Sequence, residues 1–161
     1  MQPFADSISS PVLALDLGAK RVGVAVSDAL AISISRLDSV ERTNWKQLLR
    51  DVSNLIRRFD AKTLVIGLPL RLDGSAGDAA ASARRIAQNF ARSLEIPVYL
   101  QDERLTSREA EENLREAGSA RKELAARIDS ESAALVLRDF LATDQQRLLV
   151  TPGLVRTDDV G

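Results

Sequence analysis

The sequence contains no cysteine and no histidine, and aromatic residues fill only 4% of its 161 positions. The lack of cysteine excludes disulfides, thiolate zinc sites and a nucleophilic cysteine. The lack of histidine excludes mechanisms that use an imidazole base, including the usual serine triad. Few aromatic side chains argue against a stacking platform for single-stranded nucleic acid. Any catalysis must therefore use carboxylates, Lys, Arg, Ser or Thr, with or without a metal ion.

Long apolar runs are also missing, since none approaches the roughly 20 residues of a membrane helix. The first ten residues lack the basic and apolar regions of a secretory signal. These features, with the absent cysteine, lead us to expect a cytoplasmic protein that makes no membrane contact. The net charge of −1 gives no overall attraction to nucleic acid. The 18 arginines outnumber the 4 lysines, which suits phosphate binding, although codon bias is the simpler explanation.

The length suits a single domain with one sizeable core. We expect a flexible N-terminal arm over residues 1–10, a folded domain over residues 11–142 and a C-terminal tail over residues 143–161. No repeat and no long linker interrupts the central segment.

Hydrophobic spacing predicts the elements of this domain. Three apolar strands with short turns between them favour an antiparallel meander, and helices alternate with strands after it. Strands are expected over residues 12–17, 22–26, 32–37, 63–66 and 98–100, and helices over residues 43–59, 79–94, 106–118 and from 129 to about 141. The order predicts an α/β fold whose mixed five-stranded sheet has three antiparallel strands, then two parallel ones, with helices on its faces.

Three acidic segments stand out. Asp16 ends an otherwise apolar strand, where an unpaired charge would be costly, although a role in the following turn with Lys20 or Arg21 would also explain it. Asp102 and Glu103 end the last strand and point to opposite faces if the chain stays extended. Asp129 precedes an apolar helix, where an N-cap role is the simpler interpretation.

Taken together, these acids form a more specific pattern. Ends of parallel strands gather at one edge of a mixed sheet, and a helix N-terminus can lie over the same edge. Converging carboxylates repel one another unless a divalent cation neutralises them, and oxygen ligands suit Mg²⁺ or Mn²⁺. Such ions can activate water and stabilise the leaving oxygen of a phosphodiester without a histidine.

Two further features could serve a phosphate-bearing substrate. Basic residues adjoin the acidic segments and could hold a nucleic-acid backbone, although each alone suits a solvated surface. They are Lys20, Arg21, Arg71, Arg104, Arg108, Arg121 and Lys122. Gly67, before Leu68-Pro69, either keeps a strand end open for substrate or serves ordinary turn chemistry.

Four segments in register resemble the YqgF/RuvX family. They are Leu15-Asp16-Leu17-Gly18 with Arg21–Asp28, Gly67-Leu68-Pro69 with Asp73-Gly74-Ser75, Asp102-Glu103-Arg104-Leu105-Thr106-Ser107 with Ala110, and Asp129-Ser130 with Ala133-Ala134 and Leu137. The match runs from about Val12 to Leu141, which is nearly the whole chain.

This resemblance implies an RNase H-like fold related to Holliday junction resolvases. It implies a bacterial cytoplasmic nuclease that processes the 5′ end of pre-16S rRNA. Carried over residue by residue, Asp16, Asp102, Glu103 and Asp129 form the catalytic acidic site. Asp16, Glu103 and Asp129 are the favoured ligands of Mg²⁺ or Mn²⁺, although the resemblance does not decide between Asp102 and Glu103.

Three other functions stay open at this point. The same site would suit a resolvase of branched DNA, which usually works as a dimer, so the chain is expected to be a monomer or a homodimer. A non-catalytic RNA-binding factor in ribosome assembly or transcription would need no acidic site. The Asp16-Leu17-Gly18 turn also resembles the first phosphate loop of actin-like ATP-binding folds, but those close two such domains around the nucleotide.

Overall fold

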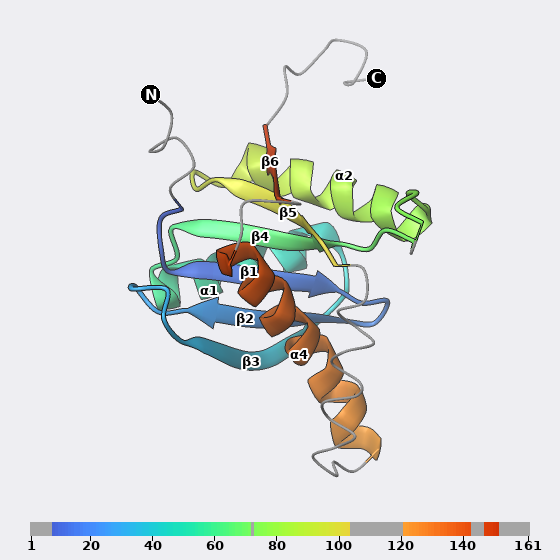
Figure 1. Ribbon diagram of the computed structural model, residues 1–161, viewed down its shortest axis with the longest axis horizontal. Helices are drawn as coiled ribbons and strands as arrows, with labels where there is room; N and C mark the ends of the chain where they lie inside the picture. The colour runs from blue at the N-terminus through green and yellow to red at the C-terminus, as the bar shows by residue number, and fades with distance from the viewer. Residues whose placement is uncertain (1–7, 72, 104–120, 143–146, 152–161) are drawn as a thin grey trace.

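The computed structural model describes residues 8–71, 73–103, 121–142 and 147–151, and Figure 1 shows them as a mixed sheet with helices on both faces. Six strands lie in the order β3-β2-β1-β4-β5-β6. The described elements, in chain order, are β1 (Val12–Leu17), β2 (Arg21–Ser27), β3 (Ile34–Glu41), α1 (Trp45–Phe59), β4 (Thr63–Leu68), α2 (Asp78–Ser93), β5 (Val98–Asp102), α4 (Arg121–Ala142) and β6 (Arg147–Val150).

Strand direction divides the sheet into two parts. β2 runs antiparallel to both β1 and β3, as the short turns predict. β4 runs parallel to β1, and β5 runs parallel to β4, because a helix crosses over between each pair. The carboxyl ends of β1, β4 and β5 therefore meet at the same edge of the sheet. This confirms the expected α/β, RNase H-like architecture.

Alternation along β1 determines which helices each residue contacts. Leu13 and Leu15 belong to the core beneath α1 and α2, whereas Val12 and Ala14 belong to the core beneath α4. Side chains alternate between the two faces of a strand, so Asp16 falls on the α4 face. Figure 1 shows α4 lying diagonally across one face of the sheet, with α1 behind it.

The helices on the opposite face follow local sequence signals. Asn44 caps α1, since its side chain accepts a hydrogen bond from the backbone N–H of Gln47 at 2.9 Å. Asp60 ends the same helix in the left-handed region, with φ of 53°. Trp45 on α1 contacts the Phe90 ring on α2 edge-to-face, with centroids 4.8 Å apart, so the two helices share one core.

The sheet has one strand more than the sequence predicted. Arg147–Val150 forms β6 within the segment expected to be a tail, and it pairs antiparallel with β5. Leu148 and Leu149 are both exposed, so this short strand lacks the buried apolar pattern that identified the others. The strand depends instead on backbone hydrogen bonds to β5.

The last helix begins earlier than predicted. α4 starts at Arg121, so Asp129 lies inside the helix and the N-cap interpretation of Asp129 is wrong. The preceding segment, Arg121–Ile128, consists largely of strong helix formers. The helix expected over residues 106–118 lies outside the described residues. Within the described part of the chain, no helix has the length and apolar character needed to cross a membrane.

Candidate active site

A row of residues on adjacent strands forms the floor of the candidate site. Leu15 of β1 is in register with Ile66 of β4, and Gly67 is in register with Gln101 of β5. Asp16, Gly67 and Gln101 therefore follow one another across three neighbouring strands, on the face that α4 covers. The backbone N–H of Glu103 donates to the carbonyl of Leu68 at 3.1 Å, which extends the β4–β5 pairing beyond the end of β5.

Asp16 and Glu103 are buried together, at 9% and 8% exposure. Burial, the negative charge of Asp16, a hydrogen bond to Asp16 and the charge of Asp102 together raise the pKa of Glu103 to about 10. In the absence of a cation, Glu103 is therefore protonated at neutral pH and donates a hydrogen bond to the Asp16 carboxylate. Asp102, the last residue of β5, is half-buried and adds negative charge beside this pair.

Gly67 makes room for the Glu103 carboxyl group. A Cβ atom built on Gly67 would overlap the Glu103 carboxyl group, with Cδ only 2.8 Å away, and would lie 3.3 Å from Cγ2 of Val136 on α4. Glu103 reaches back from the end of β5 and lies over Gly67, next to Asp16. The structure thus assigns Gly67 a role that neither sequence interpretation named, because the glycine accommodates an acidic side chain from the neighbouring strand.

This arrangement suits a hard divalent cation. Two buried carboxyl groups share one proton in a recess that a single Cβ would fill, and carboxylate oxygens are the ligands that Mg²⁺ and Mn²⁺ prefer. Among the side chains that the structure describes, no group of three acidic residues is placed to hold a metal ion. The third candidate ligand, Asp129, has its side chain outside the described part of the structure.

Replacing Gly67 by Ala is expected to lower metal-dependent activity about 10- to 100-fold, a loss typical of changes that misplace a metal ligand. The added methyl group must displace the Glu103 carboxyl group, which can rotate away because it ends a flexible side chain. We therefore expect the free energy of unfolding to change by less than about 1 kcal/mol. Initial rates and urea unfolding of both proteins measure the two effects. Full activity in Gly67→Ala would contradict the role given to this glycine.

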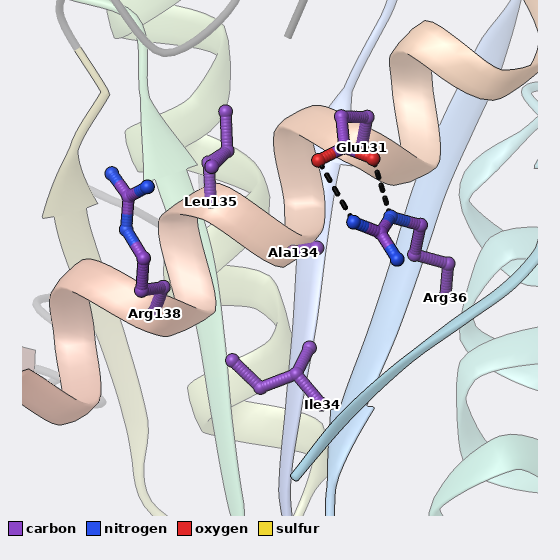
Figure 2. Close-up of a pocket in the computed structure, with 6 residues that line it drawn as sticks. All are labelled: Ile34, Arg36, Glu131, Ala134, Leu135 and Arg138. Carbon is purple, nitrogen blue, oxygen red and sulfur yellow. Dashed lines mark hydrogen bonds and ion pairs between the residues drawn. The ribbon is translucent and has the colours of Figure 1, made fainter. Parts of the chain in front are cut away.

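The position of Asp129 on α4 is fixed by its two following residues. Ser130 donates a hydrogen bond to the backbone carbonyl of Leu37 on β3 at 2.6 Å. Glu131, which is buried, forms a two-pronged ion pair with Arg36 of β3, with one N–O distance of 3.0 Å, and Figure 2 shows this pair. The hydrogen bond to Glu131 raises the pKa of Arg36 above the ordinary value of an arginine. α4 is thus anchored to β3 directly after Asp129.

Helical spacing relates Asp129 to the sheet. It lies four positions before Ala133 and seven before Val136, and both of those residues are fully buried beneath the helix. Residues four and seven apart share one face of an α-helix. Along the backbone of α4, Asp129 therefore occupies the same helical stripe as Ala133 and Val136.

The basic residues divide into three groups. Lys20 is exposed in the turn after β1, and Arg21 is half-buried at the start of β2, so both follow the strand end that carries Asp16. Arg71 is exposed in the loop after β4, and its guanidinium lies 3.1 Å from the position of a Cβ on Gly77, next to the start of α2. Arg104 and Arg108 lie outside the described residues, as do the side chains of Arg121 and Lys122.

Arg42 also supports the site, although no motif or spacing in the sequence singles it out. Its guanidinium donates to the carbonyl of Gly18 at 2.9 Å and to the hydroxyl of Ser82 on α2 at 3.2 Å. Its backbone N–H donates to the carbonyl of Lys20 at 2.9 Å. Arg42 thereby fixes the turn that follows Asp16, through contacts between segments far apart in the chain.

The sheet order and the strand-end carboxylates define an RNase H-like protein. Two solved structures of Thermus thermophilus RuvC share the fold, one of them in complex with a Holliday junction substrate. That complex has a TM-score of 0.52 and 15% identity and covers 82% of this chain and 96% of that chain. The other structure has a TM-score of 0.51 and 15% identity, and the match covers 87% of this chain and 99% of that chain.

The family follows from the sequence comparison. The model "RuvX: Holliday junction resolvase" matches residues 10–143, and the chain belongs to this family, as the four motifs predicted. A protein of Anaeromyxobacter sp. (strain Fw109-5) named "Putative pre-16S rRNA nuclease" is 40% identical over 129 residues, covering 80% of this chain and 94% of that protein. A protein of the same name from Syntrophus aciditrophicus (strain SB) is 37% identical over 138 residues, covering 85% of this chain and 92% of that protein.

Proposed function

We propose that this chain is a metal-dependent nuclease that hydrolyses a phosphodiester bond in structured RNA, with the 5′ end of precursor 16S ribosomal RNA as its target. The observation that carries the proposal is the burial of Asp16 and Glu103 together over Gly67. A buried carboxyl pair costs folding free energy, and its retention is typical of a functional site. Family membership and the names of the relatives support the same activity. A cytoplasmic location is part of the same proposal.

Asp16, Glu103 and Asp129 would hold Mg²⁺ or Mn²⁺, with Asp102 contributing charge beside them. A bound ion of this kind supplies an activated water and neutralises the charge that develops on the phosphate. Glu103 must first release its proton to serve as a ligand, which couples binding to pH. Lys20, Arg21, Arg71, Arg104, Arg108 and Lys122 would hold phosphates of the RNA backbone.

Resolution of branched DNA is the second candidate function. The family description and the RuvC fold favour it. A resolvase cuts two strands symmetrically and needs two active sites, so it would act as a homodimer. A monomer suffices for cleavage at one position of an RNA.

A direct comparison of substrates tests the proposal. The purified full-length chain is incubated with Mn²⁺ or Mg²⁺ and either a 5′-extended 16S precursor transcript or a four-way DNA junction, and light scattering gives its molecular mass. We expect cleavage of the transcript that EDTA abolishes. Preferential symmetric cleavage of the junction by a dimer would support the resolvase instead. Tight RNA binding without cleavage in either metal would support a non-catalytic assembly factor.

A further inference from the structure

Gln101, in the floor of the candidate site, is a fully buried polar residue that is not among the proposed metal ligands. Its side chain is 0% exposed, and within the described structure neither Oε1 nor Nε2 makes a hydrogen bond. A buried amide without hydrogen bonds loses its contacts with water and gains nothing in return, so it lowers the stability of the fold. An apolar side chain of similar size would avoid this cost. The position therefore calls for an explanation beyond packing.

The strand register places Gln101 beside the Glu103 carboxyl group. Gln101 is in register with Gly67, and Glu103 follows two positions later, on the same face of the extended chain. The Glu103 carboxyl group lies over Gly67, which separates Asp16 from Gln101 in the row across the sheet. In the row across the sheet, the carboxyl group thus lies between residues Asp16 and Gln101.

We propose that Gln101 is a positioning residue for Glu103, an inference that rests on the proposed metal-dependent function. A Glu103 carboxylate can accept several hydrogen bonds, and Gln101, its neighbour in the sheet register, carries an Nε2 donor that is unpaired within the described structure. A hydrogen bond from Nε2 to one carboxylate oxygen orients the other toward a shared cation. Residues that do not bind the metal themselves but hydrogen-bond to a ligand hold that ligand in place and raise the affinity for the metal.

A replacement that keeps the shape of Gln101 but removes its amide separates this role from a purely structural one. In Gln101→Met we expect the affinity for Mn²⁺, measured by calorimetry, to fall about 10- to 100-fold. The urea midpoint of the metal-free protein should stay equal or rise, because the buried amide has gone. Gln101→Leu should behave in the same way. Tyr99→Phe, on the same strand and face, is the matched control and should keep the affinity of the unmodified protein.

The outcomes distinguish this inference from the proposed function. If the unmodified chain binds no Mn²⁺, the proposed function fails. If the unmodified chain binds Mn²⁺, Asp16→Asn abolishes binding and Gln101→Met binds normally, only the positioning role fails. A structural amide would lower the urea midpoint of both Gln101→Met and Gln101→Leu but leave the Mn²⁺ affinity of the folded variants unchanged. That result would also overturn the inference. Weaker Mn²⁺ binding with an equal or higher midpoint supports it.

Discussion

Replacing Asp16 by Asn is expected to slow metal-dependent cleavage of precursor RNA at least about 100-fold. Removing a metal ligand should lower activity more than removing a residue that only hydrogen-bonds to a ligand, which typically costs about 10- to 100-fold. Asp16 is buried beside Glu103, and Asn keeps its shape while removing the negative charge. The Asn carbonyl can still accept the hydrogen bond that protonated Glu103 donates, so the fold should persist. Initial rates at saturating Mn²⁺ give the effect on catalysis, and circular dichroism checks the fold.

The matched control for this change is Asp38→Asn. Asp38 is exposed on β3, at the far side of the same sheet, so its replacement removes one negative charge without touching the carboxyl pair. We expect unchanged cleavage in this variant. Undiminished cleavage in Asp16→Asn would remove Asp16 from the active site.

Replacing Glu103 by Gln is expected to change how stability depends on pH in the metal-free protein. The pKa of Glu103 rises from 4.5 to about 10 on folding. Between these values the unfolded chain releases the proton while the folded chain keeps it, so rising pH lowers the free energy of unfolding. One unit of pKa shift corresponds to about 1.4 kcal/mol. Gln stays neutral and can still donate to Asp16, so Glu103→Gln should lack this loss.

Urea unfolding in EDTA measures this difference. Between about pH 5 and about pH 8, the unmodified protein should lose at least about 1.4 kcal/mol relative to Glu103→Gln. Glu95→Gln, at an exposed carboxyl group after α2, is the control and should follow the unmodified protein. Parallel pH profiles for Glu103→Gln and the unmodified protein would mean that Glu103 is ionised at neutral pH in the folded state.

Much of the fold could be predicted because its signals are local. The short turn over residues 18–20 makes β1 and β2 antiparallel, and apolar spacing with Asn44 marks α1. β6 was missed because Arg147–Val150 is short and its leucines are exposed, so it depends on distant pairing with β5. The start of α4 was misplaced because Asp129-Ser130 resembles a helix cap, whereas Ser130 bonds to β3.

The site was partly predictable for a related reason. Strand-end reasoning indicated that Asp16 would meet one member of the Asp102-Glu103 pair, and Glu103 is the one buried beside it. The roles of Gly67 and Gln101 could not be foreseen. They depend on the register between β4 and β5 and on the path of the Glu103 side chain, and neither leaves a periodic or compositional signal.

A Mn²⁺ soak of crystals of the unmodified chain tests directly whether the Asp16 and Glu103 carboxylates form one cation site. Anomalous scattering locates the ion independently of any activity assay. We predict a peak within about 2.0–2.5 Å of a carboxylate oxygen from both Asp16 and Glu103, above Gly67. A density map with no peak between these two residues at saturating Mn²⁺, while their carboxyl groups stay hydrogen-bonded to each other, would show that Asp16 and Glu103 do not form a cation site.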